Sequence, residues 1–220
     1  MRRHLTPGLL LAAALCASHP ARAQEAAGSA ARVRFDSTAV RSPDGALVAF
    51  VRDTPGDSVD AGSGPVARTE LWVARADGTA ARRLLRGRDA PDVRHMLAGL
   101  SRLAFSPDGR TVYAESAAWA TSGALHAVDV ATGAERFVAA SNGYEVLRRG
   151  AFAGHLLVAQ HRYYTGTDGS YEALVLVSPD GRTERFVALE DAPDAEARAA
   201  ALRAGRLPPA RPFPRRAPAR

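Results

Sequence analysis

An internal repeat constrains the fold of this chain more than any other feature of its sequence. The tetrapeptide Ser-Pro-Asp-Gly is followed by a short apolar run where it occupies residues 42–45 and again where it occupies residues 106–109. Proline holds φ at about −65° and glycine readily takes a positive φ, so the tetrapeptide predicts a tight turn between two short strands. Modules of this size bury their apolar faces only against neighbouring modules. The repeat therefore predicts a stack of small β-sheets and disfavours an all-helical bundle.

A second unit, a β-rich run that ends in a tight turn, occurs three times. The three runs are residues 71–78, 125–133 and 174–181. The glycines that close their turns, Gly78, Gly133 and Gly181, lie 55 and 48 residues apart. After the last two turns the pentapeptide Glu-Arg-Phe-Val-Ala appears at 135–139 and at 184–188. A spacing of about 40 to 50 residues is typical of β-propeller blades with four antiparallel strands.

Each repeat is interpreted as strand a, tight turn, strand b, variable loop, strand c, tight turn and strand d. The three copies cover residues 33–85, 100–139 and 146–189. The predicted fold class is all-β, with about three propeller-type blades of four antiparallel strands in a partial or open propeller. The predicted domain spans residues 33–190, after a linker at 24–32.

The repeated turns carry a resemblance to a known family. A Ser-Pro-Asp-Gly turn between two strands, followed by a Leu-Trp-Val strand and an Asp-Gly turn, resembles the blade of TolB-type, WD-repeat-like periplasmic β-propellers. It is also similar to the N-terminal propellers of prolyl oligopeptidase-type enzymes. The resemblance covers residues 33–189. Closed propellers have about four to eight blades, so three alternatives stay open: a homodimer that completes the ring, an open half, or a truncated form of a longer protein.

The N-terminus has the pattern of a secretory signal peptide. Two arginines at positions 2 and 3 precede a short apolar run, and Ala21 and Ala23 stand where signal peptidase reads small residues. We expect residues 1–23 to be cleaved after Ala23 and the mature chain to be periplasmic or secreted, without stable membrane insertion. A retained N-terminal anchor is the alternative. Cys16 is the single cysteine, so the mature chain has neither a disulfide nor a thiolate metal site.

The net charge of +6 does not indicate a nucleic-acid-binding protein. Residues 1–23 carry +3 and residues 191–220 carry +4, which leaves the predicted propeller nearly neutral. Phosphate binding needs a basic stripe on a folded face. Residues 191–220 are rich in alanine, arginine and proline, and we expect a flexible tail with a short helix at 195–204. Contact of this basic tail with anionic lipid or a polyanion is the functional alternative.

The search for catalytic and metal-binding patterns finds no candidate. The sequence has no Gly-x-Ser-x-Gly element and no His-Glu-x-x-His pattern. His126 is interpreted as a strand residue, and the aspartates of the Pro-Asp-Gly turns as structural acceptors. The acidic loop at 53–60 lacks the ligand spacing of a calcium loop. We therefore predict no catalytic residues, no metal and no cofactor.

The variable b–c loops indicate where a ligand binds. Together with the connections between blades they emerge at one end of the sheets, and they hold the most aromatic segment of the mature chain. The predicted binding residues are Trp119, His161, Arg162, Tyr163, Tyr164, Asp168 and Tyr171. Tyrosine and arginine are suitable contact anchors, because each combines a large apolar area with a polar end. In the alternative interpretation Tyr163 and Tyr171 only complete strands and pack on their neighbours.

These observations predict an exported, non-catalytic binding or scaffold module. Its partner would be a protein, peptide or other envelope ligand bound at the b–c end. The alternative is the propeller portion, or a remnant, of a prolyl oligopeptidase-like hydrolase.

Overall fold

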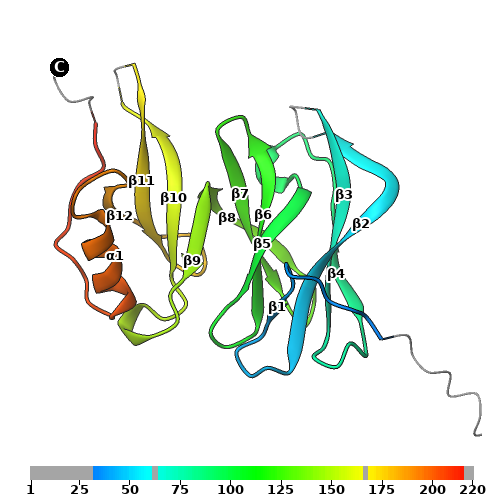
Figure 1. Cartoon of the computed structure of the whole chain (residues 1–220). Coiled ribbons are helices and arrows are strands. Elements are labelled where there is room, and N and C mark those ends of the chain that lie inside the picture. Colours follow the sequence, from blue (N-terminus) through cyan, green and yellow to red (C-terminus); the bar gives the residue numbers. More distant parts are fainter. Residues whose placement is uncertain (1–31, 61–63, 166–167, 216–220) are drawn as a thin grey trace, which may run out of the picture. The chain divides into compact units, whose positions relative to one another are not determined.

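The computed structural model describes residues 32–60, 64–165 and 168–215. Within these residues twelve strands form three antiparallel sheets of four strands each (Figure 1). Sheet 1 contains β1 (Val40–Arg41), β2 (Leu47–Asp60), β3 (Pro65–Arg75) and β4 (Arg82–Arg86). Sheet 2 contains β5 (Ala98–Phe105), β6 (Thr111–Trp119), β7 (Ser122–Asp129) and β8 (Glu135–Ser141). Sheet 3 contains β9 (Gly143–Val146), β10 (Leu156–Tyr163), β11 (Ser170–Val177) and β12 (Glu184–Leu189).

The strand order confirms the predicted fold class. In every sheet the order in space follows the order in the chain, as in a propeller blade. Three such sheets are fewer than a closed propeller contains, so the all-β fold is a partial or open propeller. The predicted signal peptide, residues 1–23, lies outside the described residues.

The Ser-Pro-Asp-Gly turns are closed by a repeated set of hydrogen bonds. At the first turn Ser42 Oγ donates to Asp44 Oδ1 at 2.5 Å, and the Leu47 N–H donates to Ser42 Oγ at 2.9 Å. The corresponding hydroxyl–carboxylate bonds measure 2.6 Å at Asp108 and 2.5 Å at Asp180. The aspartates are therefore turn acceptors, as the sequence predicts.

These turns predict a specific response to acid. The serine hydroxyl, followed by a backbone N–H, lowers the pKa of Asp44, Asp108 and Asp180 in the folded chain. A lowered folded-state pKa contributes stability that is present above the unfolded value of about 4 and is lost as the pH falls further. The triple Asp→Asn variant at these positions keeps an acceptor oxygen but cannot titrate. We expect its urea midpoint to decline less between pH 5 and pH 2.5 than that of the parent chain.

The control for this measurement is Asp168→Asn, which removes a negative charge outside these turns. Equal declines in the parent chain and in the triple variant would show that the turns do not contribute to acid sensitivity.

The residues of β11 alternate between two apolar clusters, because successive side chains of a strand point to opposite faces. One cluster, shared with sheet 2, takes Ala173, Val175 and Val177. The other cluster, on the opposite face, takes Leu174 and Leu176. Sheet 3 thus buries both of its faces.

The three sheets meet through a repeated contact between a turn glycine and an outer strand. Gly133 has φ +74°, and a Cβ at this position would lie 2.5 Å from the carbonyl oxygen of Leu84 in β4. Gly181 also has φ +74°, and its Cβ would lie 2.7 Å from the carbonyl oxygen of Val138 in β8. Leu84 and Val138 lie in the fourth strands of sheets 1 and 2. The turn between the third and fourth strands of one sheet is therefore seated on the last strand of the sheet before it.

Helix α1 (Ala195–Arg203) covers the face of sheet 3 that is turned away from sheet 2 (Figure 1). Ala199 and Leu202 are 1% and 0% exposed and pack in one cluster with Leu176 and Val187. The predicted helix at 195–204 is thus present, one residue shorter. The sequence predicts a flexible tail for residues 191–220, whereas its described part packs against sheet 3 through this helix.

After α1 comes the proline-rich segment, residues 206–215, which also contacts sheet 3. Pro208 is buried, and its carbonyl oxygen accepts a hydrogen bond from Arg185 of β12 at 2.9 Å. Arg198 of α1 is 8% exposed and donates both to the Val187 carbonyl and to the Pro209 carbonyl. Arginine side chains thus donate to the carbonyl oxygens of the segment, because a proline-rich chain lacks the backbone N–H groups that would do so.

Candidate functional site

The end of each sheet where its second and third strands are connected is the end at which the sequence predicts ligand binding. These connections follow Asp60 in sheet 1, Trp119 in sheet 2 and Tyr163 in sheet 3. We call them, together with the chain between β4 and β5, the rim.

Four of the predicted residues meet in one cavity of the rim. His161, Arg162, Tyr163 and Tyr171 line a cavity of about 540 Å³. Its other residues are Thr165, Pro212, Phe213, Pro214 and Arg215. We call this the β10–β11 cavity. Its far wall is the proline-rich segment, which the sequence alone did not place there.

Arg162 is held in this cavity by several contacts. It lies on β10 opposite Tyr171 of β11. Its Nε donates to Gln160 Oε1 at 2.8 Å, and its Nη2 forms a short ion pair with Glu184 of β12. Gln160 is only 2% exposed, so the guanidinium is held by a buried partner and by Glu184 of β12, which lies beyond β11 in the sheet. Its position is therefore set before any ligand arrives.

The aromatic residues of this region differ in exposure and in support. Tyr163 is 67% exposed, and its ring meets that of His161 edge to face at 5.1 Å. Tyr164 packs on Tyr171 with ring centroids 4.8 Å apart. Burial raises the pKa of the Tyr171 phenol, against a smaller opposing effect of Arg162. Tyr171 thus packs against a neighbouring ring, while Tyr163 presents its ring to solvent.

Three predicted residues do not line this cavity: Trp119, Asp168 and Tyr164, which packs on Tyr171. Trp119 ends β6 in sheet 2, is 38% exposed and packs edge to face on Phe137 at 6.2 Å. Asp168 is exposed in the connection between β10 and β11, outside the residues that line the cavity. The b–c loops share an end of their sheets, but their side chains do not converge on one point.

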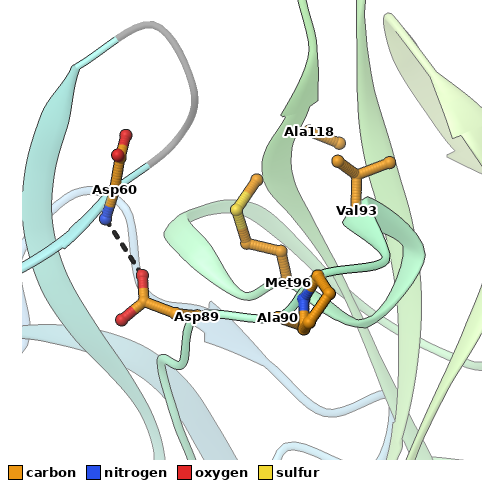
Figure 2. Close-up of a pocket in the computed structure, with 7 residues that line it drawn as sticks. Asp60, Asp89, Ala90, Val93, Met96 and Ala118 are labelled. Atoms are coloured by element: carbon orange, nitrogen blue, oxygen red, sulfur yellow. Dashed lines mark hydrogen bonds between the residues drawn. The ribbon is translucent and has the colours of Figure 1, made fainter.

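Sequence reasoning missed a second cavity of the rim, which has a volume of about 490 Å³ (Figure 2). It is lined by Asp60, Asp89, Ala90, Pro91, Val93, Met96 and Ala118. The Asp60 N–H donates to Asp89 Oδ1 at 3.0 Å, which joins the end of β2 to the connection between β4 and β5. The signal available in the sequence was the length of the connection between β4 and β5, which runs from Arg86 to Ala98. The equivalent connection between β8 and β9 is the single residue Asn142.

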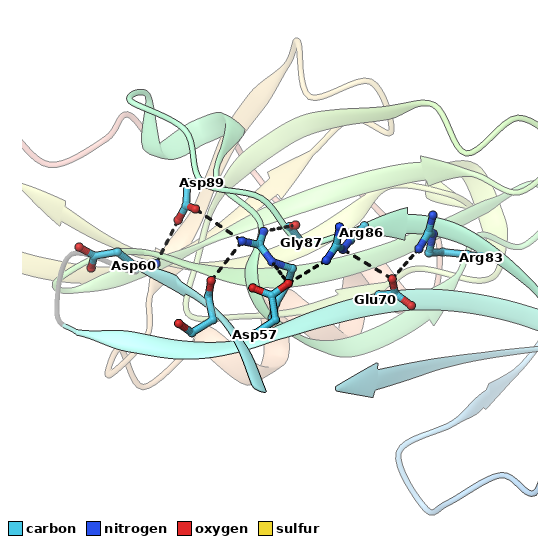
Figure 3. Close-up of polar contacts among 9 residues, drawn as sticks. Asp57, Asp60, Glu70, Arg83, Arg86, Gly87 and Asp89 are labelled. Carbon is cyan, nitrogen blue, oxygen red and sulfur yellow. Dashed lines mark hydrogen bonds and ion pairs between the residues drawn. The ribbon is translucent and has the colours of Figure 1, made fainter. Parts of the chain in front are cut away.

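An arginine network supports this cavity (Figure 3). Arg68 of β3 donates to Asp57 Oδ2 at 2.8 Å and to the Gly87 carbonyl at 2.6 Å. Arg86 pairs with the same Asp57 oxygen at 2.7 Å. The hydrogen bond from Arg68 and the two positive charges lower the pKa of Asp57, against a smaller effect of burial. The acidic loop predicted at 53–60 is therefore part of β2, and Asp57 serves as an internal counter-ion.

Sheet 2 contains a serine, a histidine and a glutamate in contact, yet they do not form an accessible catalytic site. His126 Nε2 lies 3.0 Å from Ser116 Oγ, and His126 Nδ1 lies 2.6 Å from Glu135 Oε1. Arg88 pairs with the other oxygen of Glu135. Burial raises the pKa of Glu135, but hydrogen bonds from His126 and Arg88 outweigh it and the net shift is downward. His126 is 0% and Ser116 3% exposed, so a substrate cannot reach them and their role is structural.

Among the residues that the structure describes, no group of three histidine, cysteine, aspartate or glutamate side chains is arranged to hold a metal ion. Within the same residues, no helix has the length and apolar character needed to cross a bilayer.

No protein-family model and no curated protein matches the sequence. Among solved structures, the chain is similar to TolB from Acinetobacter baumannii, with 12% identity and a TM-score of 0.43 over 69% of this chain and 32% of that one. It is similar to the β-propeller domain of the Trilobed protease from Pyrococcus furiosus, with 15% identity and a TM-score of 0.44 over 71% and 45%. The tricorn protease matches with 14% identity and a TM-score of 0.45 over 69% and 13%. The chain covers less than half of each of these proteins.

Proposed function

We propose that this chain is an exported, non-catalytic binding module that holds a protein or peptide ligand of the cell envelope at the β10–β11 cavity. The observation that carries the proposal is the convergence of His161, Arg162, Tyr163 and Tyr171 on one cavity. In this cavity Tyr163 remains 67% exposed beside an arginine whose position is already fixed.

The chemistry of the cavity supports recognition of a polypeptide. An exposed tyrosine and an oriented arginine are the residue types that dominate protein interfaces. The tilted contact between the rings of Tyr164 and Tyr171 stiffens the loop beside Tyr163, which reduces the ordering entropy lost on binding. Export rests on the signal-peptide pattern of residues 1–23.

A role in binding also agrees with how the chain uses its acid–base groups. The one contact among serine, histidine and glutamate described above is enclosed within sheet 2. Glu172 pairs with His161, and Glu184 pairs with Arg162. These two glutamates thus hold in position the side chains of His161 and Arg162, which line the β10–β11 cavity.

The test is capture of a partner from envelope extract by the immobilised processed chain. We expect the Tyr163→Ala/Tyr164→Ala variant to retain at least about 10-fold less partner than the parent chain, because interface anchors of this type contribute about 2 kcal/mol or more. Quantitative mass spectrometry of the retained proteins measures the loss.

Leu207→Ala is the matched control, since Leu207 is 48% exposed and lies outside the cavity. A thermal unfolding scan of each variant separates lost binding from lost folding. Undiminished capture by a folded double variant would overturn the assignment of this cavity.

A further inference from the structure

The proline-rich segment is attached to sheet 3 in the way that a bound peptide would be. β12 is an edge strand, with a hydrogen-bonded neighbour only at β11. The segment lies beside it, and two arginines donate to successive carbonyls of the segment, Arg185 to Pro208 and Arg198 to Pro209. A polyproline-type chain leaves its carbonyl oxygens free for such donors.

The aromatic residue of the segment is seated in a small receptor site. Phe213 stands between Pro212 and Pro214, and its ring packs on Phe186 of β12 with centroids 5.4 Å apart. The guanidinium carbon of Arg162 lies 4.3 Å from the centre of the same ring. Phe186 is only 5% exposed, so the receptor is a fixed part of the sheet.

The remaining contacts of the segment are weak. Pro212 is exposed, Phe213 and Pro214 are half-buried, and the ion pair between Arg211 and Asp194 is between groups that are 45% and 42% exposed. Exposed ion pairs contribute little to stability. The segment therefore holds its place through one ring, the buried Pro208 and a few carbonyls, which a competing peptide of the same chemistry could replace.

We propose that the site formed by Arg162, Phe186 and Arg185 is a groove for an extended peptide with a proline-flanked aromatic residue, and that residues 207–215 occupy it in cis. Proline-rich peptides bind aromatic grooves because their extended form is largely preformed and little entropy is lost. This inference rests on the proposed function, since it names the class of partner that enters at the β10–β11 cavity by displacing the segment.

Residues 207–215 are part of the same chain, so they compete with a free peptide at a high effective concentration. The apparent Kd of the free peptide is the intrinsic Kd divided by the fraction of chains in which the groove is open. The probe is a fluorescein-labelled peptide with the sequence of residues 207–215, LPPARPFPR, and the measurement is fluorescence polarisation with the full processed chain. We expect the Phe213→Ala chain to bind it at least about 10-fold more tightly than the parent chain.

Three controls make this result specific. The Arg110→Ala chain, changed at an exposed turn residue of sheet 2, should bind as weakly as the parent chain. The same peptide with alanine in place of its phenylalanine should not bind the Phe213→Ala chain, and this comparison uses a single protein preparation, so it does not depend on how that variant folds. Adding Arg162→Ala to the Phe213→Ala chain should weaken binding at least about 10-fold, because the cation over the ring is lost.

Equal binding by the parent and Phe213→Ala chains, or equal binding of the two peptides, would overturn the inference. The two proposals fail separately. If envelope capture depends on Tyr163 and Tyr164 but the peptide does not bind, the cavity is a binding site for another kind of partner. If the peptide binds while capture is insensitive to the tyrosines, the groove stands and the assignment of the tyrosines is wrong.

Discussion

Replacing Gly133 by alanine is expected to lower the free energy of unfolding by about 2–5 kcal/mol, whereas Gly45→Ala should cost about 1–2 kcal/mol. The two glycines have nearly the same backbone conformation, φ +74° and φ +73°. They differ in what surrounds them. A methyl group at Gly133 would lie 2.5 Å from the Leu84 carbonyl oxygen, while nothing lies within 4 Å of a methyl group at Gly45.

The pair separates two physical effects. Gly45→Ala reports only the cost of a left-handed conformation for a residue with a Cβ. Gly133→Ala adds the steric conflict between sheet 1 and sheet 2, which overpacking data place at about 1–3 kcal/mol. Urea unfolding of the two variants, with the slope of the transition compared as well as its midpoint, measures the difference.

Gly181→Ala tests the same contact at the next pair of sheets, because its methyl group would lie 2.7 Å from the carbonyl oxygen of Val138. If both turn variants cost no more than Gly45→Ala, the sheets do not depend on this contact with their neighbours. The expected result would instead show that each sheet is fitted to the one before it, as in other repeat proteins.

Most of the fold was predictable because its signals are local. Ser42 and Asp44 satisfy each other within one turn, so the tetrapeptide alone specifies that turn. The alternation along β11 likewise follows from adjacent residues. Where the sequence repeats such local signals, it also repeats the sheet, which is why three four-stranded modules could be predicted from the chain.

The site was only partly predictable because it depends on contacts between distant residues. His161, Arg162 and Tyr163 are consecutive at the end of β10, so their proximity follows from the sequence itself. The opposite wall depends on Phe213, which is about fifty residues away and has no periodic pattern that indicates its place. In the same way, the extension of β2 to Asp60 depends on Arg68 and Arg86 as partners for Asp57. Proline density correctly excluded strand pairing for residues 206–215, but it did not indicate that neighbouring arginines would bind the carbonyls.

Leu202→Ala is expected to destabilise the chain by about 2–5 kcal/mol. Leu202 is 0% exposed and packs between α1 and sheet 3 with Leu157 and Val187. The helix has nine residues, and helices of this length are marginal in water, so its stability must come from this packing. Leu207→Ala removes the same atoms from a side chain that is 48% exposed, and should cost less than about 0.5 kcal/mol.

The comparison decides what α1 does for sheet 3. The face it covers is the one on which a further sheet would stack, and a second copy that completed a ring through that face would first have to expel the helix. A large effect of Leu202→Ala on the urea midpoint, with none for Leu207→Ala, would make α1 a cap of the kind that terminal elements of repeat proteins provide. Equal, small effects would mean that the helix contributes nothing to folding, and the outer face of sheet 3 would then be available to another sheet.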